Sequence, residues 1–389
     1  MALRFGIVAG ETSGDALGAG LMAALKERVE CTFEGICGPL MIAQGGMSRY
    51  PIESLAVVGI AEVVGRLPGL VRMRSELVRY FRRSRPDCVI GIDAPDFTLA
   101  LERALKKDGI PVVHYVSPTV WAWRRYRVRT VAASADRLLA LFPFEPPYYR
   151  GRIDVRYVGH PLADRIRPAD REAARAELKL DADDLVIALL PGSRTSELKA
   201  HADLFVKTAL RLMLRYPRCR FVVPFVNRET RALFDAALTR ARAFDLPITR
   251  QHGHAQLAME AADLVIAASG TATLEAALIG RPLIVTYRLA AASFWVIRAL
   301  SRLPFYSLPN HLLGEAAVPE FLQHAATSDA LVREAERLIE HPEERARMVA
   351  AMGRIREMLS RGADARAAEA VLDLVSPGEA SLSAASCGS

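Results

Sequence analysis

Two aspartates that could carry acid–base chemistry, Asp93 and Asp96, follow the apolar run Cys88–Ile92. A carboxylate held in a dry cleft can have its pKa raised and act as a general base. An aspartate at the end of a strand is also often an ordinary helix N-cap, and this is the alternative for either residue. Because the two acids lie three residues apart around Pro95, we expect at least one of them to be functional.

A turn with the composition of an anion site, Pro191–Arg194, follows the apolar run Leu185–Leu190. Ser193 and the fixed cation of Arg194 stand where a helix would begin, which suits a pyrophosphate. The turn is not a Walker A loop, because it lacks the GxxxxGK[ST] pattern. The alternative is a solvated arginine in an ordinary turn.

A second turn of small residues, Ala268–Glu275, follows the apolar run Asp263–Ala267. Gly270 and Thr271 would let a phosphate approach a helix N-terminus. Glu275, one turn into that helix, could bind a ribose diol, as acidic residues do in other nucleotide sites. The alternative is a helix start with an exposed glutamate.

The turn Gly10–Asp15 lies between an apolar run and a helical pattern near the N-terminus. It could present backbone N–H groups to an anion or a hydroxyl, or it could be a plain strand-to-helix turn. It is not GxGxxG, so a nicotinamide or flavin site is not supported. The segment His114–Trp123, rich in aromatics and followed by arginines, could form a lip beside a site, whereas His114 itself is expected to be a hydrogen-bonded core residue.

No metal site is predicted. The acidic run Asp181–Asp184 contains a DxD pattern, which binds a metal in some glycosyltransferases, but it precedes an apolar run in a polar stretch and is better explained as a solvated turn. No pair of cysteines makes CxxC. We therefore expect neither a metal ion nor a cofactor.

Positive charge is concentrated in Arg66–Arg85, which holds seven arginines and one glutamate, a net charge of +6. Its apolar residues fall close to one face at helical spacing. Such a helix is typical of a membrane surface, a partner helix or nucleic acid, although part of its apolar face could be ordinary core. The segment Leu289–Tyr306 is a second apolar candidate for the same surface. We expect four side chains to face an anionic membrane, namely Arg66, Arg72, Arg74 and Arg79.

Composition limits the remaining classes. The chain has 389 residues, with 51 Lys and Arg against 44 Asp and Glu, a net charge of +7. Five scattered cysteines exclude a disulfide scaffold, and no apolar run approaches the ~20 residues of a membrane span. The N-terminus lacks a signal-peptide pattern, so a cytoplasmic protein with reduced thiols is expected.

Short apolar runs alternate with helical patterns along the chain, which predicts α/β architecture with parallel sheets. A break at Gly159-His160-Pro161 divides two series of runs. We predict Rossmann-like domains at 1–165 and 166–375, with a cleft between them and a disordered tail at 376–389. The last helices could pack back on the first domain. Ligands should lie at the carboxyl ends of the strands.

Several motifs together resemble the lipid-A-disaccharide synthases, in order and over nearly the whole chain. They are GETSGD (10–15), GIDAPDF (91–97), HYVSPTVWAWR (114–124), FPFE (142–145), VGHPLAD (158–164), LPGSRTSE (190–197), ASGTATLEA (268–276) and SLPNHLL (307–313). The resemblance implies a glycosyltransferase of the GT-B fold. The implied reaction joins UDP-2,3-diacylglucosamine to 2,3-diacylglucosamine 1-phosphate, and releases the β-1,6 tetraacyl disaccharide 1-phosphate and UDP.

The resemblance also implies residue roles. Asp96 matches the family's proposed general base, and Arg194 and Glu275 match its donor contacts. Asn310 matches an asparagine that matters for activity, and we place it with the donor residues. The acceptor and cleft residues are then expected to be Glu11, Ser13, Gly14, Asp93 and Ser117. Two positions depart from the family, because Leu40 and Glu315 stand where basic residues are common.

Other functions remain as alternatives. A UDP-sugar 2-epimerase can share the two-domain plan, and a non-catalytic binding module for lipids or nucleotide sugars is a third class. A nucleic-acid partner is not expected, since neither an RNP pattern nor a helix-turn-helix signal is present. The implied substrates place the protein peripherally on the inner face of the cytoplasmic membrane. Whether it forms a homo-oligomer is left open.

Overall fold

The structure of the chain is a computed structural model. It describes residues 2–55, 60–121, 125–167, 169–288 and 304–375, and it describes residues 60–66 by their backbone only. The predicted tail at 376–389, most of the second apolar segment (289–303) and the side chain of Arg66 lie outside the described residues.

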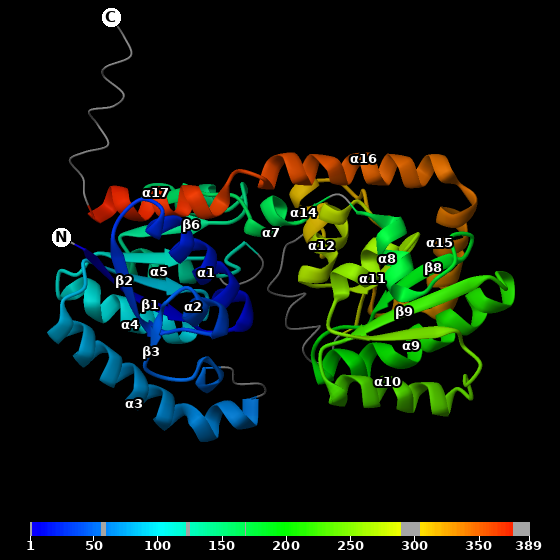
Figure 1. The fold of residues 1–389 in the computed structure, drawn as a ribbon, viewed down its shortest axis with the longest axis horizontal. Coiled ribbons are helices and arrows are strands. Elements are labelled where there is room, and N and C mark those ends of the chain that lie inside the picture. Colours follow the sequence, from blue (N-terminus) through cyan, green and yellow to red (C-terminus); the bar gives the residue numbers. More distant parts are fainter. Residues whose placement is uncertain (1, 56–59, 122–124, 168, 289–303, 376–389) are drawn as a thin grey trace, which may run out of the picture. The chain divides into compact units, whose positions relative to one another are not determined.

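The chain forms two compact units. Unit 1 contains Met1–Asp164 and the C-terminal segment from Leu359, and unit 2 contains Arg165–Met358. Each unit has its own parallel β-sheet with helices on both faces (Figure 1).

The sheet of unit 1 has seven parallel strands in the order β3-β2-β1-β4-β5-β6-β7. Its inner strands are continuous apolar runs that are buried on both faces, as parallel strands require. The strand bounds are β1 Leu3–Ala9, β2 Cys31–Ile36, β3 Met47–Ser48, β4 Cys88–Ile92, β5 Val112–Tyr115, β6 Arg137–Ala140 and β7 Asp154–Tyr157.

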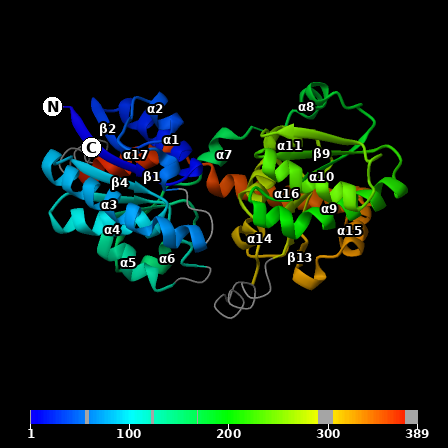
Figure 2. The same cartoon turned by 90° about the horizontal axis from the view of Figure 1, so that it is seen from below.

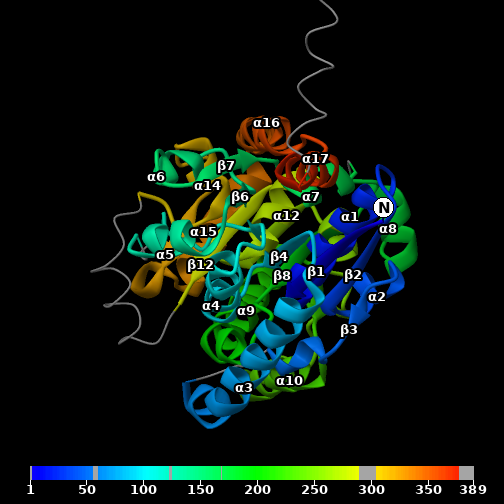
Figure 3. The same ribbon diagram turned by 90° about the vertical axis from the view of Figure 1, so that its left-hand side faces the viewer.

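Helices from both ends of the chain cover this sheet. Helix α17 lies beside α1 on one face, and α3 and α4 lie on the other (Figures 1 and 3). Arg137 of β6 donates through Nη1 to the carbonyl oxygen of Ala370, which ties α17 to the sheet. The helix bounds are α1 Thr12–Lys26, α2 Pro39–Ala43, α3 Ile60–Ser84, α4 Pro95–Lys107, α5 Arg127–Ser134, α6 Pro146–Tyr149, α7 Pro161–Arg165 and α17 Ala363–Val375, with a 3-10 turn at Ile52–Ser54.

The sheet of unit 2 has six parallel strands in the order β10-β9-β8-β11-β12-β13. Helices α9 and α10 pack together on one face, and α8, α11 and α12 lie on the other (Figures 1 and 2). The strands are β8 Leu185–Leu190, β9 Cys219–Phe225, β10 Ile248–His252, β11 Leu264–Ala268, β12 Leu283–Tyr287 and β13 Glu320–Leu322. The helices are α8 Arg171–Leu178, α9 Thr195–Arg215, α10 Arg228–Arg240, α11 Ala255–Ala261, α12 Thr271–Ile279, α14 Leu308–Leu313, α15 Ser328–Glu340 and α16 Pro342–Leu359, with a 3-10 turn at Gln323–Ala325.

Each sheet has one point where the direction of winding reverses. In unit 1 it lies between β1 and β4, and in unit 2 between β8 and β11. Ligands of doubly wound sheets bind outside the carboxyl ends of the strands at this point. The turns that follow these four strands are the motifs singled out by the sequence. Among the described residues, no helix has both the length and the apolar character needed to cross a membrane.

Candidate functional site

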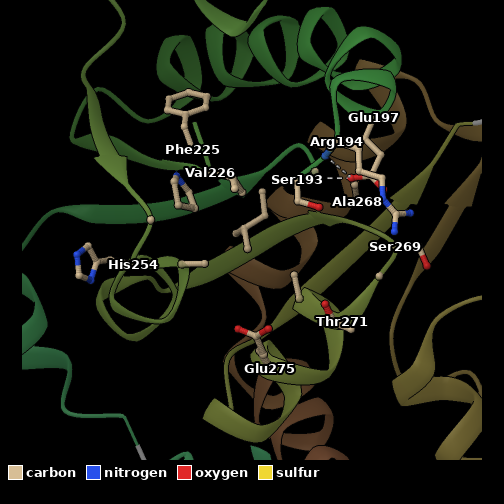
Figure 4. Close-up of a pocket in the computed structure, with 17 residues that line it drawn as sticks. Ser193, Arg194, Glu197, Phe225, Val226, His254, Ala268, Ser269, Thr271 and Glu275 are labelled. Carbon is tan, nitrogen blue, oxygen red and sulfur yellow. Dashed lines mark hydrogen bonds between the residues drawn. The ribbon is translucent and has the colours of Figure 1, made fainter. Parts of the chain in front are cut away.

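A pocket of about 480 Å³ lies at the winding reversal of unit 2, where the turns after β8 and β11 face each other (Figure 4). It brings together all but one of the residues predicted to bind the donor; Asn310 does not line it. The lining residues of the first turn and of its helix are Gly192, Ser193, Arg194 and Glu197; those of the second are Ala268, Ser269, Gly270, Thr271, Ala272 and Glu275.

Glu197 builds the first turn. Its Oε2 accepts hydrogen bonds from the backbone N–H groups of Ser193 (2.8 Å) and Arg194 (3.2 Å), drawn as dashed lines in Figure 4. A Cβ at Gly192, where φ is 122°, would collide with the Glu197 side chain, so the turn needs glycine there. Arg194 is exposed, and no ion pair is seen for it among the residues that the structure describes. It is therefore available to an anion in the pocket.

Glu275 projects toward the pocket from the first two turns of α12 (Figure 4). Within the described part of the chain, its carboxylate has no hydrogen-bond partner. Burial raises the pKa of Glu275 above its ordinary value, because the surroundings remove water from the charged form. A half-buried carboxylate without a partner is suited to accept hydrogen bonds from ligand hydroxyl groups.

The opposite wall of the pocket contains residues that the sequence reasoning missed. Phe225 is the last residue of β9, Val226 follows it, and His254 precedes α11 with φ 52°. Val226 is exposed although it is apolar. The rule that ligands lie at the carboxyl ends of strands could have found them, since all three lie at or just beyond the end of β9 or β10.

In unit 1, the turns after β1 and β4 are in contact. A Cβ on Gly10 would overlap the Cβ of Ala94, so only glycine fits at position 10. Asp93 and Ala94 both have left-handed backbone conformations, with φ 51° and 45°. Such strain persists only where the surroundings enforce it, and it is frequent at functional sites. Thr98 supports the turn, because its Oγ1 donates to the Asp93 carbonyl oxygen at 2.8 Å.

Asp96 lies in the first turn of α4, and its side chain is 83% exposed. Its Oδ1 forms an ion pair with Nη2 of Arg127, whose side chain is only 10% exposed. Asp93 is half-buried at the same sheet edge. The two predicted acids thus share one turn, and Asp96 is the more exposed of the two.

The GETSGD turn divides into an exposed and a buried part. Glu11 and Ser13 are exposed at the start of α1, whereas Gly14 is buried against Ala9 and Ile92. Asp15 is 2% exposed and accepts hydrogen bonds from the backbone N–H groups of Leu40 (2.9 Å) and Met41 (3.0 Å). Asp15 therefore fixes the start of α2 and is a structural residue.

Ser117 is buried within a hydrogen-bonded cluster. Its Oγ lies 2.8 Å from the hydroxyl of Tyr149 and is hydrogen-bonded to Glu145. Glu145 also accepts from the backbone N–H groups of Leu141 and Phe142, each at 3.0 Å. Burial raises the pKa of Glu145 to about 8, and the hydrogen bonds oppose this shift only in part. The cluster joins the carboxyl ends of β5 and β6 from inside the unit.

Asn310 is 1% exposed and organises the segment before β13. Its amide nitrogen donates to the Val318 carbonyl oxygen (2.7 Å) and to Glu320 (2.8 Å), and its amide oxygen accepts from the Val318 N–H (2.8 Å). Glu320 also accepts from the hydroxyl of Ser307. That Asn310 contributes to donor binding stays a prediction. In this structure its side chain forms hydrogen bonds with Val318 and Glu320.

The basic helix α3 has two different halves. Leu77, Val78 and Phe81 are buried in the core of unit 1, whereas Leu67 and Val71 are 52% and 43% exposed. Arg72 and Arg79 are exposed and Arg74 is half-buried. Arg72 pairs with Glu76, and Arg82 pairs with Asp108. The first described turns of α3 therefore combine exposed apolar and basic side chains.

Neither of the two residues that depart from the family motifs is among those that line the pocket of unit 2. Leu40 is exposed on α2, and Glu315 forms an ion pair with Arg354 of α16. In the acidic run, Asp184 faces Arg218 and Arg220, which neutralise it. No cluster of metal-ligating side chains occurs among the residues that the structure describes.

Solved structures share the fold across the whole chain. One is UDP-GlcNAc 2-epimerase from Neisseria meningitidis bound to UDP-GlcNAc, with a TM-score of 0.63 at 14% identity over 97% of this chain and 100% of that one. Another is the glycotransferase of kitacinnamycin, with a TM-score of 0.64 at 16% identity over 96% and 100%. At these identities the likeness concerns the fold alone. The predicted fold class is confirmed: two Rossmann-like units of the GT-B type, a class that contains glycosyltransferases and epimerases.

The sequence comparisons separate these two activities. A profile of the lipid-A-disaccharide synthetase family matches residues 5–374. The chain is 49% identical to the lipid-A-disaccharide synthase of Methylobacillus flagellatus over 95% of this chain and 99% of the relative, and 49% identical to that of Azotobacter vinelandii over 96% and 98%. The chain belongs to the lipid-A-disaccharide synthase family. It is an enzyme, a glycosyltransferase of lipid A biosynthesis, as the motifs predicted.

Proposed function

We propose that the protein transfers 2,3-diacylglucosamine from its UDP derivative to the 6-hydroxyl of 2,3-diacylglucosamine 1-phosphate. The products are the β-1,6 tetraacyl disaccharide 1-phosphate and UDP. The observation that carries the proposal is the pocket of unit 2, where Arg194 and Glu275 line one cavity and neither side chain is paired with another described residue. Names of the close relatives support the same product.

In the proposed donor complex, the diphosphate lies against the turn after β8 and the start of α12. Ser193, Arg194 and the N–H groups at Gly270 and Thr271 donate to its oxygens. Glu275 accepts from the ribose hydroxyls. These groups stabilise the negative charge that develops on UDP as it leaves, so we expect turnover without an added metal ion.

Asp96 is the proposed general base. It accepts the proton of the acceptor hydroxyl while that oxygen attacks the anomeric carbon from the face opposite UDP, in one inverting displacement. The exposure of its side chain leaves it accessible to an acceptor. Glu11 and Ser13 lie just after β1, and Asp93 lies just after β4, at the same edge of the sheet as Asp96. We assign all three to binding of the acceptor. General-base assistance is worth about 10²–10⁴-fold in rate.

The first described turns of α3 are the proposed contact with an anionic membrane surface. Leu67 and Val71 would enter the headgroup region, while Arg72, Arg74 and Arg79 attract anionic lipids. In this proposal the enzyme acts on the inner face of the cytoplasmic membrane, where its acylated substrates would lie.

One assay tests the reaction. The protein is incubated with both acylated monosaccharide substrates, with and without a chelator, and the lipid product and UDP are measured. Disaccharide and UDP formed in equal amounts would support the proposal. A rearranged UDP-sugar without acceptor would instead indicate an epimerase, and binding without any product would indicate a binding module. Loss of product with the chelator alone would overturn only the metal-free step.

A further inference from the structure

Arg127 reaches from the interior of unit 1 to a carboxylate on its surface. The residue is 8% exposed as a whole, and its Nη2 is paired with Oδ1 of Asp96, whose side chain is 83% exposed. The two residues come from different helices, α5 and α4, and are separated by about thirty positions in the chain. A buried cation is thus paired with a carboxylate on a largely exposed side chain.

The framework around Arg127 is rigid. Helix α5 packs on α4, and the neighbouring Val128 and Val131 belong to a small buried core. The other buried members of that core are Leu99, Val120, Leu138 and Tyr149. Close-packed side chains of this kind keep one rotamer, so the guanidinium is presented at a fixed place.

The backbone of Asp96 is equally constrained. Pro95 begins α4, and Ala94 before it is held in a left-handed conformation against Gly10. What the backbone does not fix is the rotation of the exposed carboxylate about its side-chain torsions. The ion pair with Arg127 restricts that rotation.

We propose that Arg127 is a positioning residue for the reaction, acting through Asp96 by fixing the orientation of its carboxylate. The inference rests on the proposed role of Asp96 as the general base. The benefit of Arg127 lies in geometry, since a misplacement of about 1 Å can cost about 10²-fold in rate.

The test uses the full-length protein and both substrates. Arg127→Met removes the ion pair, and Arg127→Lys restores a cation without the planar guanidinium. Arg129→Met is the matched control, because Arg129 is exposed two residues further along the same helix. We expect Arg127→Met to lower kcat about ten- to hundredfold with KM for both substrates changed less than about twofold. Arg127→Lys should recover part of kcat, and Arg129→Met should match the wild type.

A double-mutant cycle keeps the proposal falsifiable if Arg127→Met loses stability. In the Asp96→Asn background, Arg127→Met should have no further effect on the residual rate, because its partner's charge is already absent. If Arg127→Met lowered the rate equally in the wild type and in Asp96→Asn, the positioning role would be overturned. A rise in KM with kcat unchanged would also overturn it, and would indicate that Arg127 binds a substrate anion. Unchanged kinetics of Arg127→Met would overturn it as well. If the wild type itself makes no disaccharide, the proposed function fails instead.

Discussion

Gly10 and Ala94 touch across two neighbouring turns of unit 1, so closely that a Cβ at position 10 would overlap that of Ala94. The contact joins the turn after β1 to the turn after β4, and the latter continues directly into Asp96. A motif that looks like a plain glycine-rich turn in the sequence therefore supports the backbone of the proposed base.

Gly10→Ala should lower activity more than a simple surface change would. The added methyl group must push the turn at Ala94 away, because neither backbone can yield without moving a strand end. We expect a loss of kcat of about tenfold or more and a destabilisation of about 1–3 kcal/mol, measured by steady-state kinetics and denaturant unfolding. Gly353→Ala is the control: nothing lies within 4 Å of a Cβ there, so activity should be unchanged. Wild-type kinetics for Gly10→Ala would contradict the contact.

Glu275→Gln should weaken UDP binding while stabilising the free protein. Desolvation raises the pKa of this carboxyl group in the folded state, so ionisation of Glu275 costs stability once the pH is above its unfolded value. The amide removes that cost but also removes a charged acceptor for ribose hydroxyls. We expect about tenfold weaker binding by calorimetry, together with a higher midpoint of denaturant unfolding.

The pH dependence of UDP binding gives a second readout for Glu275. In the wild type, affinity should fall as the pH is lowered through the raised pKa, because protonation removes the acceptor. In Glu275→Gln it should not change over the same window. Parallel profiles for the two proteins would show that Glu275 does not bind the nucleotide.

Glu145 should make the stability of unit 1 depend on pH. Burial raises its folded-state pKa from 4.5 to about 8, so the folded protein binds one more proton than the unfolded chain between these values. The stability that Glu145 contributes is therefore present below about pH 4.5 and is lost as the pH rises to about 8.

Denaturant unfolding of the wild type and Glu145→Gln at pH 5, 6, 7 and 8 checks this sign. The stability of Glu145→Gln relative to the wild type should improve steadily over the series, and then level off above pH 8. The control is Glu53→Gln, an exposed site in the same unit. A constant difference between Glu145→Gln and the wild type across the series would contradict the raised pKa.

Arg72, Arg74 and Arg79 of α3 should bind the protein to anionic vesicles through electrostatic attraction. Replacing Arg74 and Arg79 with Ser should weaken binding to phosphatidylglycerol-containing vesicles about thirtyfold, because each arginine near such a surface contributes about 1 kcal/mol. Added salt should release the wild type at concentrations that leave it folded. Co-sedimentation measures both effects, and Arg129→Ser is the control. Equal binding to neutral vesicles, or binding insensitive to salt, would contradict the proposal that α3 contacts an anionic membrane through its basic residues.

Much of the fold is readable from the sequence, because buried parallel strands are continuous apolar runs. The apolar runs Cys88–Ile92, Leu185–Leu190 and Asp263–Ala267, which precede the candidate turns, are strands in the structure within one residue of these bounds. The strands Met47–Ser48 and Glu320–Leu322, which were not predicted, lie at the edges of the two sheets and have only two and three residues. Their pairing depends on the neighbouring strand and leaves no periodic signal.

The site was only partly predictable. Turns after strands are marked by glycine and small residues, so Ser193, Arg194 and Glu275 could be placed at one pocket from topology alone. Contacts between distant residues could not be placed. The sequence around Asp96 does not predict its ion pair with Arg127. The SLPN motif likewise does not show that the side chain of Asn310 is hydrogen-bonded to Val318 and Glu320. Such pairs are set by how elements pack, which one sequence does not reveal.

The rate of disaccharide formation by Asp96→Asn, compared with the wild type under saturating substrates, tests the central claim most directly. Asparagine keeps the shape of the side chain but cannot take the proton of the acceptor hydroxyl. The account predicts a fall in kcat of about 10²–10⁴-fold, with UDP binding and the unfolding midpoint close to those of the wild type. Near wild-type turnover by a folded Asp96→Asn variant would contradict the assignment of Asp96 as the base.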